Sequence, residues 1–282
     1  MINGKFRKLE NTEVEGIIHL GGTILKSSRS KRFREKKGRA TALKNLVRHK
    51  IDTLIVIGGN GSIRGAFAFA KETGFPVVCI PKTIDNDVPG TDYTIGFDTA
   101  LNNAVEAIDK IRISAGSHNR TFFIEVMGRD AGHIALHAGI ATASEVIMIP
   151  ETISDLRELN KAVKAHYGKK RSPMIVIVAE GDDAGHAVDI ARKIGANFKD
   201  LDPGVSVLGY IQRGGKPSVF DRYLATAMGV HAAEFALKGG KNMFAAYLGG
   251  MIKMAPASLL SKKDHPIDKE LLSLARKLGQ IV

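Results

Sequence analysis

The feature that most constrains the fold of this chain is a repeated alternation of short apolar runs with longer helical patterns. Residues 53–57 and 174–179 are continuous apolar runs rich in β-branched side chains, typical of parallel strands that are buried on both faces. Glycine-bearing turns and then helical patterns follow them. Because strand–helix–strand connections favour parallel pairing with right-handed crossovers, we expect an α/β fold with mostly parallel sheets flanked by helices.

The rest of the chain continues this alternation. Further apolar runs predict strands over residues 76–80, 121–126, 146–150 and 205–209. Helical patterns cover residues 41–49, 63–73, 99–113, 156–167, 184–194, 221–237 and 268–278, and another helix is expected to end near residue 143. Residues 1–16 are polar and predict no strong strand.

Composition limits the classes of protein to consider. The 282 residues are 44% hydrophobic, which is enough apolar material for a core in one or two domains. The single cysteine, Cys79, excludes a disulfide within the chain and fits a reducing compartment. Because no signal-peptide pattern and no long apolar run is visible, we expect a cytoplasmic protein with no membrane partner.

The net charge of +12 indicates an anionic partner, either nucleic acid, an anionic membrane or a phosphorylated small molecule. Basic residues cluster between Lys26 and Lys50, with Phe33 as the aromatic residue among them. A base-stacking surface is therefore not supported, and we expect no nucleic-acid partner. Within this cluster, residues 27–34 indicate a basic, serine-rich loop that is either simply solvated or a phosphate clamp.

The segment Pro81-Lys82-Thr83-Ile84-Asp85-Asn86-Asp87 carries the strongest chemical signal. It follows a predicted strand, and ligands of open α/β sheets bind beyond the carboxyl ends of strands. Its two carboxylates suit a division of labour between a proton acceptor and a metal ligand. The lysine and the threonine suit a phosphorylated substrate. The alternative is a polar turn with no chemical role.

Glycine-bearing turns at two other strand ends strengthen this hypothesis. Gly58-Gly59-Asn60-Gly61-Ser62 lies between a predicted strand and a predicted helix, where backbone N–H groups and the helix dipole attract phosphate. Its spacing is neither a P-loop nor a dinucleotide fingerprint, and a plain strand-to-helix turn is the alternative. A second such unit, Met127-Gly128-Arg129-Asp130-Ala131-Gly132, carries an arginine.

Five motifs in order resemble the phosphofructokinase family. They are Gly-Gly-x-Gly-Ser at 58–62, Pro-Lys-Thr-Ile-Asp-Asn-Asp at 81–87, Gly-Thr-Asp-Tyr-Thr-Ile-Gly-Phe at 90–97, Glu-Val-Met-Gly-Arg at 125–129 and Leu-Gly-x-Ile-Gln-Arg-Gly-Gly at 208–215. The resemblance implies a glycolytic kinase that transfers a phosphoryl group from ATP to the 1-hydroxyl of fructose 6-phosphate, with Mg²⁺. It also implies a two-lobed α/β fold and a homo-oligomer, usually a tetramer, with shared sites.

The resemblance also implies a role for each matching residue. Asp85 matches the base that takes the sugar hydroxyl proton, and Thr83 and Arg129 match catalytic neighbours. The positions matching the donor site are Arg29, Ser30, Gly59, Asn60, Gly61, Ser62 and Lys82, and the positions matching the metal site are Asn60 and Asp87. The positions matching the substrate site are Thr83, Ile84, Asp85, Arg120, Met127, Gly128, Arg129, Glu180, Tyr210 and Arg213. Of these, Arg120 is expected to reach in from a neighbouring subunit. Arg112 and Glu145 match positions near an allosteric nucleotide site.

On this basis we expect two lobes. Residues 1–96 with about 209–259 form the expected donor-binding lobe, and about 97–208 with 260–282 form the sugar-phosphate-binding lobe. The family's first strand and its Gly-Gly-Asp-x-Pro-Gly-x-Asn loop have no match here, so we expect the donor lobe to be incomplete at its N-terminus. Asn60, Gly204 and Tyr210 depart from the family's usual aspartate, arginine and histidine.

Several functions remain open on the sequence alone. In the family that the chain resembles, Gly61 goes with ATP as donor, whereas Lys82 goes with pyrophosphate users but also with some ATP-using branches. A pyrophosphate-dependent phosphofructokinase is therefore one alternative. A truncated, non-catalytic protein that binds sugar phosphates or regulates an intact chain is another. A different kinase with the same Gly-Gly-x-Gly-Ser turn is disfavoured by the motifs at 81–87 and 208–215.

Overall fold

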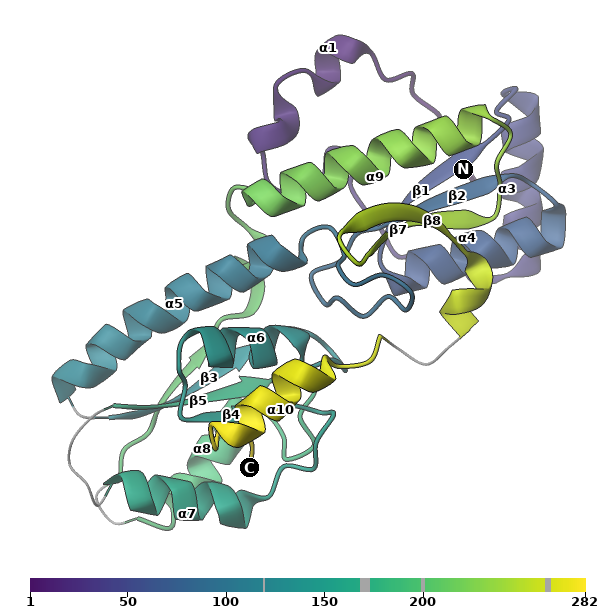
Figure 1. The fold of residues 1–282 in the computed structure, drawn as a ribbon. Coiled ribbons are helices and arrows are strands. Elements are labelled where there is room, and N and C mark those ends of the chain that lie inside the picture. The colour runs from purple at the N-terminus through teal and green to yellow at the C-terminus, as the bar shows by residue number, and fades with distance from the viewer. Residues whose placement is uncertain (119, 168–172, 199–200, 262–264) are drawn as a thin grey trace. The chain divides into compact units, whose positions relative to one another are not determined.

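The computed structural model describes residues 1–118, 120–167, 173–198, 201–261 and 265–282. The chain divides into two compact units (Figure 1). Unit 1 comprises Met1–Thr83, Asp87–Gly96 and Lys216–Pro266, and unit 2 comprises Ile84–Asn86, Phe97–Gly215 and Ile267–Val282. The assignment of a donor-binding role to one lobe and a sugar-binding role to the other stays a prediction.

The sheet of unit 1 has the strand order β1-β2-β7-β8. Strands β1 (Leu54–Gly58), β2 (Val77–Pro81) and β7 (Met243–Leu248) are parallel, and β8 (Met251–Pro256) returns antiparallel to β7. Gly249 and Gly250 form the turn of this hairpin, both with positive φ, as a two-residue hairpin turn requires. The sequence reasoning missed both strands, although this Gly-Gly pair was a signal for them.

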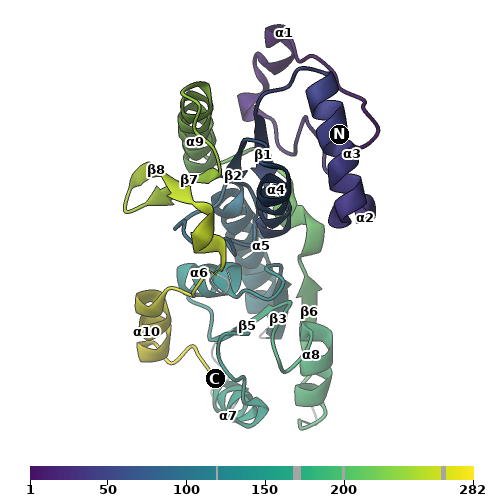
Figure 2. The same ribbon diagram turned by 90° about the vertical axis from the view of Figure 1, so that its right-hand side faces the viewer.

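Helices cover both faces of this sheet. On one face α4 (Asn60–Thr73) packs on β1 and β2, and Phe69 is fully buried there. On the other face α9 (Val219–Leu237) packs on β2, β7 and β8, as both views show (Figures 1 and 2). The remaining elements of unit 1 are α1 (Asn11–Val14), η1 (Ile17–His19), α2 (Lys31–Arg34), α3 (Lys36–Arg48) and η3 (Ala257–Ser261).

The sheet of unit 2 is entirely parallel within the described residues, with the order β4-β5-β3-β6. Its strands are β3 (Thr121–Val126), β4 (Val146–Met148), β5 (Met174–Ala179) and β6 (Gly204–Val207). Every residue of β5 is buried, as its unbroken apolar sequence predicts for a strand covered on both faces. Its helices are α5 (Phe97–His118), α6 (His133–Ala141), α7 (Leu156–Tyr167), α8 (Ala187–Gly195), η2 (Gly209–Arg213) and α10 (Lys269–Lys277).

The α/β class with mostly parallel sheets is confirmed, and one local prediction is wrong. Residues 27–34 were expected to be a loop, but the last four of them form the short helix α2. The Ser30 hydroxyl caps this helix by accepting a hydrogen bond from the Phe33 N–H at 3.2 Å. Helix-capping chemistry therefore outweighs the charge run that suggested an irregular segment. Within the described residues, no helix is long and apolar enough to cross a membrane.

Candidate functional site

In unit 1 the segment 58–62 forms a tight turn from β1 into α4. Gly59 is the N-cap residue and Asn60 is the first helical residue. A Cβ atom on Gly58 would lie 2.7 Å from the Ser62 Cβ, so the turn requires glycine there. Gly61 and Ser62 are exposed in the first helical turn, and a Cβ on Gly61 would meet nothing within 4 Å. The N-terminus of α4 therefore presents open space of a kind that attracts anions.

The end of β2 lies directly beside this turn. The Lys82 N–H donates to the Gly58 carbonyl at 2.9 Å, and a Cβ on Gly59 would lie 3.2 Å from the Thr83 Cβ. The Thr83 carbonyl in turn accepts a hydrogen bond from the Thr94 hydroxyl at 2.8 Å. The parallel pairing of β1 and β2 thus brings the 58–62 turn together with Lys82 and Thr83.

Arg29 and Ser30 lie on a more exposed part of unit 1. Both are exposed, and the Ser30 hydroxyl is engaged as the α2 cap. The following Phe33 packs against Phe69 of α4, with ring centroids 5.9 Å apart. This contact ties the start of α2 to the helix that carries the 58–62 turn. The donor-binding role predicted for Arg29 and Ser30 stays a prediction.

Asn60 and Asp87 lie together, as a shared metal site would require. The Asn60 amide nitrogen lies 3.5 Å from the Asp87 Oδ2. The Asn60 amide oxygen accepts a hydrogen bond from the Arg64 Nε at 2.7 Å. Mg²⁺ in proteins commonly needs only one or two carboxylates beside substrate phosphates and water. Asp87 fits that requirement, whereas the Asn60 oxygen is directed to a guanidinium and not to Asp87.

In unit 2 a buried carboxylate is paired with an arginine. Asp85 is 4% exposed. Its Oδ2 lies 3.5 Å from the Arg129 Nε, although the two residues are far apart in the sequence. Arg129 itself is partly open to solvent, with 57% of its side chain exposed. The pair therefore joins a buried carboxylate to an accessible cation, a combination suited to chemistry on an anionic substrate.

The loop after β3 has an unusual backbone that fixes Arg129. Gly128 has φ +150° and Arg129 has φ +55°. A Cβ on Gly128 would lie 2.3 Å from the Ala131 carbonyl oxygen, so the turn requires glycine. The Arg129 N–H donates to the Glu180 Oε1 at 2.8 Å. Glu180, which follows β5, thereby holds the arginine loop of the neighbouring strand.

The segment after β6 joins the same edge of the sheet. The Met127 N–H donates to the Gln212 Oε1 at 3.3 Å, which links the loops that follow β3 and β6. The Arg213 guanidinium lies over the Tyr210 ring, 5.2 Å from its centroid, and Tyr210 is 79% exposed. Tyr210 therefore supports Arg213 through a cation–π contact.

Arg120 lies at the opposite edge of this sheet. It precedes β3, whereas Met127 follows that strand. The six residues of β3 span about 20 Å at ~3.3 Å per residue. The Arg120 guanidinium pairs with the Asp202 carboxylate at 3.3 Å. Arg120 is thus the one predicted substrate residue of unit 2 that the fold keeps away from the others.

Burial shifts the pKa of other ionisable groups of unit 2, among them Asp182 and His137, neither of which was singled out from the sequence. Asp182 is 6% exposed and accepts hydrogen bonds from the Ser154 hydroxyl at 2.7 Å and the Ala184 N–H at 2.9 Å. Burial raises the pKa of its carboxyl despite these bonds. Burial also lowers the pKa of the His137 imidazole. In unit 1, burial raises the pKa of the Cys79 thiol to about 12, so this cysteine is a structural residue.

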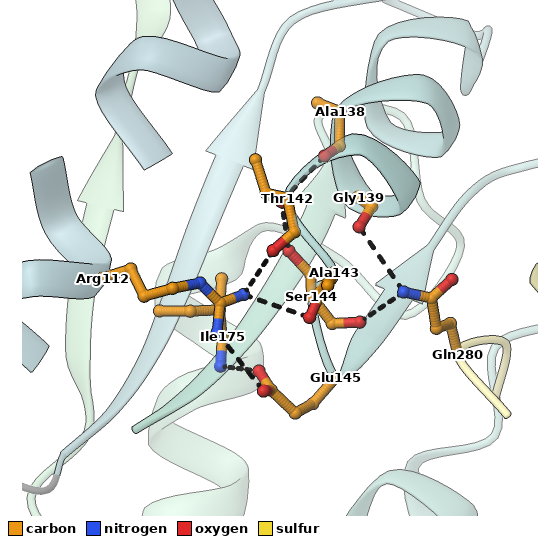
Figure 3. A network of polar contacts seen from close by, with 9 residues as sticks. All are labelled: Arg112, Ala138, Gly139, Thr142, Ala143, Ser144, Glu145, Ile175 and Gln280. Carbon is orange, nitrogen blue, oxygen red and sulfur yellow. Dashed lines mark hydrogen bonds and ion pairs between the residues drawn. The ribbon is translucent and has the colours of Figure 1, made fainter. Parts of the chain in front are cut away.

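A separate polar network in unit 2 contains Arg112 and Glu145 (Figure 3). The Arg112 Nη1 lies 3.3 Å from the Glu145 Oε1, and the Arg112 Nη2 donates to the Thr142 carbonyl at 2.9 Å. Gln280 donates to the Ser144 carbonyl at 2.7 Å and so ties the C-terminal residues to the same turn. A depression of about 370 Å³ adjoins this network. The effector role predicted for Arg112 and Glu145 stays a prediction.

Among the described residues no group of three or more His, Cys, Asp or Glu side chains forms a metal-binding cluster.

The fold and the site together define an α/β protein with glycine turns, arginines and a buried aspartate at the carboxyl ends of parallel strands. Comparisons with known proteins make the assignment specific. The phosphofructokinase family profile matches residues 1–236. ATP-dependent 6-phosphofructokinases from Cytophaga hutchinsonii and Bacillus pumilus are each 45% identical over 99% of this chain, covering 85% and 86% of their own lengths. The chain belongs to the phosphofructokinase family.

Solved structures agree with this assignment. Pichia pastoris phosphofructokinase in the T-state superposes with a TM-score of 0.82 and 34% identity, over 96% of this chain and 31% of that larger chain. A pyrophosphate-dependent phosphofructokinase from Marinobacter aquaeolei superposes with a TM-score of 0.78 at 23% identity, over 96% of this chain and 77% of its own. At that identity the second likeness concerns the fold alone.

Proposed function

We propose that this chain is an ATP-dependent 6-phosphofructokinase, which transfers the γ-phosphoryl group of ATP to the 1-hydroxyl of fructose 6-phosphate. The observation that carries the proposal is the buried Asp85 carboxylate beside the Arg129 guanidinium at 3.5 Å. The membership of this chain in the phosphofructokinase family also supports the proposal. The reaction belongs to glycolysis, so we expect the protein to act in the cytoplasm.

Asp85 acts as the general base in this proposal. Its carboxylate accepts the proton of the attacking sugar hydroxyl, and Arg129 neutralises negative charge that develops on the transferred phosphoryl group. A loose phosphoryl-transfer transition state needs alignment and charge neutralisation more than covalent assistance. Thr83, which lies two residues before Asp85, is proposed as a further polar contact to the reacting groups.

The sugar phosphate binds to the loops at the carboxyl edge of the unit 2 sheet. Arg213 clamps the 6-phosphate and Glu180 accepts hydrogen bonds from sugar hydroxyls. Tyr210 contributes a hydroxyl and, through the cation–π contact, also orients Arg213. Ile84, Met127 and Gly128 complete the proposed contact surface.

ATP is the donor best supported by the relatives. Curated relatives that are 40–45% identical to this chain are named ATP-dependent 6-phosphofructokinase. The open space beyond Gly61 is compatible with a bulky nucleotide. The proposed donor contacts are Arg29, Ser30, Gly59, Asn60, Gly61, Ser62 and Lys82. Lys82 is the feature that keeps pyrophosphate as the alternative donor.

Mg²⁺ is proposed to accompany the donor phosphates. Asp87 would hold the cation, with Asn60 as a neighbour that lends no charge. When bound, the cation would neutralise charge on the donor phosphates. Lys82 and the N-terminus of α4 would orient the same phosphates through their own positive charge.

Arg120 supports a homo-oligomer with shared sites. The fold holds it at the edge of the unit 2 sheet opposite Met127 and Arg129. We propose that Arg120 contacts the 6-phosphate bound to a neighbouring copy of the chain. A dimer or a tetramer would both satisfy this requirement.

A coupled assay of the purified chain tests the proposal. Fructose 6-phosphate and Mg²⁺ are supplied with either ATP or pyrophosphate, and formation of fructose 1,6-bisphosphate is followed. Turnover with ATP and not with pyrophosphate is the expected result. Turnover with pyrophosphate alone would replace the proposed donor. Absence of turnover with both donors, together with fructose 6-phosphate binding by calorimetry, would favour a sugar-phosphate-binding protein without catalysis.

A further inference from the structure

Gln212 is a buried amide that joins two loops of unit 2. It is 1% exposed, although its neighbours Ile211 and Arg213 are exposed. Its Oε1 accepts the Met127 N–H at 3.3 Å, and its Nε2 donates to the Gly209 carbonyl at 3.1 Å. Both ends of the amide group are therefore satisfied, and they connect the loop after β3 with the turn that carries Arg213.

A second amide holds the same segment from the other side. The Asn103 Nδ2 on α5 donates to the Gly214 carbonyl at 2.8 Å and lies 3.3 Å from the Gln212 carbonyl. The carbonyls on both sides of Arg213 are thus fixed to α5. A Cβ on Gly215 would lie 3.2 Å from the Asn103 Oδ1, so the glycine permits this close approach.

We propose that Gln212 and Asn103 are positioning residues that set the spacing between Arg213 and the Met127-Gly128-Arg129 loop. The inference deepens the proposed function, on which it rests. Arg213 is the last residue of the short 3-10 helix η2 and Arg129 lies in a turn, and both are exposed cations. Two such cations can hold one phosphorylated sugar only if their loops keep a fixed separation, and misplacement by about 1 Å can cost about a hundredfold in rate.

Hydrogen-bond chemistry makes Gln212 suited to this role. Glutamine supplies one acceptor and two donors from a single planar group. A glutamate could accept the Met127 N–H but could not donate to the Gly209 carbonyl. A methionine would fill the same space without forming either bond. Gln212→Met therefore separates the effect of the hydrogen bonds from the effect of the side-chain volume.

Steady-state kinetics of Gln212→Met and Asn103→Ala test the inference. We expect kcat/KM for fructose 6-phosphate to fall about 10- to 100-fold, chiefly through KM. KM for ATP should stay within about twofold, because this amide pair contacts the proposed sugar-phosphate loops and not the donor residues. The matched control is Asn102→Ala, which removes an exposed asparagine on the same helix whose amide donates to the Asp98 carbonyl at 2.7 Å.

A double-mutant cycle with Arg213→Met separates positioning from general stability. If Gln212 acts through Arg213, Gln212→Met should cost much less when Arg213 is already absent, so the two effects should not multiply. A purely structural Gln212 would give multiplying effects and would lower kcat/KM for both substrates together. That result, or unchanged KM for fructose 6-phosphate in Gln212→Met, would overturn the inference. A wild-type chain that neither turns over nor binds fructose 6-phosphate would overturn the proposed function as well.

Discussion

Single residues show how local packing determines which side chains this site can carry. Position 204, where the resemblance to the family implies an arginine, holds a glycine that lies against an aromatic ring. A Cβ there would lie 2.4 Å from the Phe122 ring. The register of β6 against β3 places these two residues opposite each other. The Phe122 ring therefore fills the space that a side chain at position 204 would need.

The substitution Gly204→Ala should lower the free energy of unfolding by about 1–3 kcal/mol, the usual cost of overpacking. Gly61→Ala is the matched control, because a Cβ there would meet nothing within 4 Å. Urea denaturation of the two variants measures the difference. Equal stability of Gly204→Ala and the wild type would show that Phe122 moves aside without cost.

Position 60 determines how much ligand charge the proposed Mg²⁺ site offers. Asn60→Asp would place a second carboxylate beside Asp87, at a position now 3.5 Å from it. We expect the Mg²⁺ concentration for half-maximal activity to fall about 3- to 10-fold, because added ligand charge strengthens binding of a hard cation. Titration of Mg²⁺ in the coupled assay, with Asn60→Ala for comparison, measures this. An unchanged Mg²⁺ dependence would remove position 60 from the metal site.

The sequence predicted that the motifs follow strands, but it did not predict the contacts between the motifs. Lys82 and Thr83 could be placed after a strand, but their contact with the 58–62 turn depends on the parallel pairing of β1 with β2. The contact between Glu180 and the Arg129 N–H could not be predicted, because it depends on positive φ angles and on the order of β5 and β3. Gln212 lies within a motif, but its burial depends on tertiary contacts.

Among the secondary-structure elements, continuous patterns gave the most accurate boundaries. The predicted segments 121–126, 156–167 and 174–179 agree to the residue with β3, α7 and β5. The hairpin of β7 and β8 was missed because its strands lack a long β-branched run, and one of its strands is only partly buried. In this sequence, a strand can thus be predicted most readily when both of its faces are buried.

The turn between β5 and α8 contains a buried ionisable group, the Asp182 carboxyl, whose titration affects the stability of the fold. Burial raises the pKa of the Asp182 carboxyl above its ordinary value of 3.8. A raised native pKa means that the folded state binds the proton more tightly than the unfolded state. Stability should therefore fall as the pH rises from about 3.8 through the native pKa, and then level off.

Asp182→Asn should remove this decline, because the amide stays neutral at every pH and can still accept the Ala184 N–H. The free energy of unfolding, measured from about pH 4 to about pH 7, should fall less steeply in the variant than in the wild type. Asp183→Asn, at the exposed neighbouring residue, is the matched control. Parallel curves for Asp182→Asn and the wild type would contradict the assigned titration.

At the scale of the whole molecule, the proposed residues divide between the two units. The proposed donor contacts and Asp87 belong to unit 1, whereas Asp85, Arg129, Glu180 and Arg213 belong to unit 2. The segment 81–87 passes from unit 1 into unit 2 at Ile84 and returns at Asp87. Asp85 therefore belongs to unit 2 and Asp87 to unit 1. The spacing of the two aspartates in the sequence did not predict this division.

Mixing two inactive variants tests whether sites are shared between copies. Arg120→Met and Arg213→Met should each be nearly inactive alone, because each removes one cation from every site. In co-expressed chains, about half of two-fold dimers would be hybrids with one intact site, so about a quarter of wild-type activity should return. No recovery in a mixed oligomer of verified composition would show that Arg120 serves no neighbouring site.

Asp85 is proposed as the general base of the phosphoryl transfer. Turnover and fructose 6-phosphate binding in Asp85→Asn, compared with those in the wild type, test this role. We predict that kcat falls about 10²- to 10⁴-fold while the calorimetric Kd stays within about threefold, because only proton acceptance is lost. Turnover that survives the substitution would contradict the claim and remove Asp85 from the mechanism.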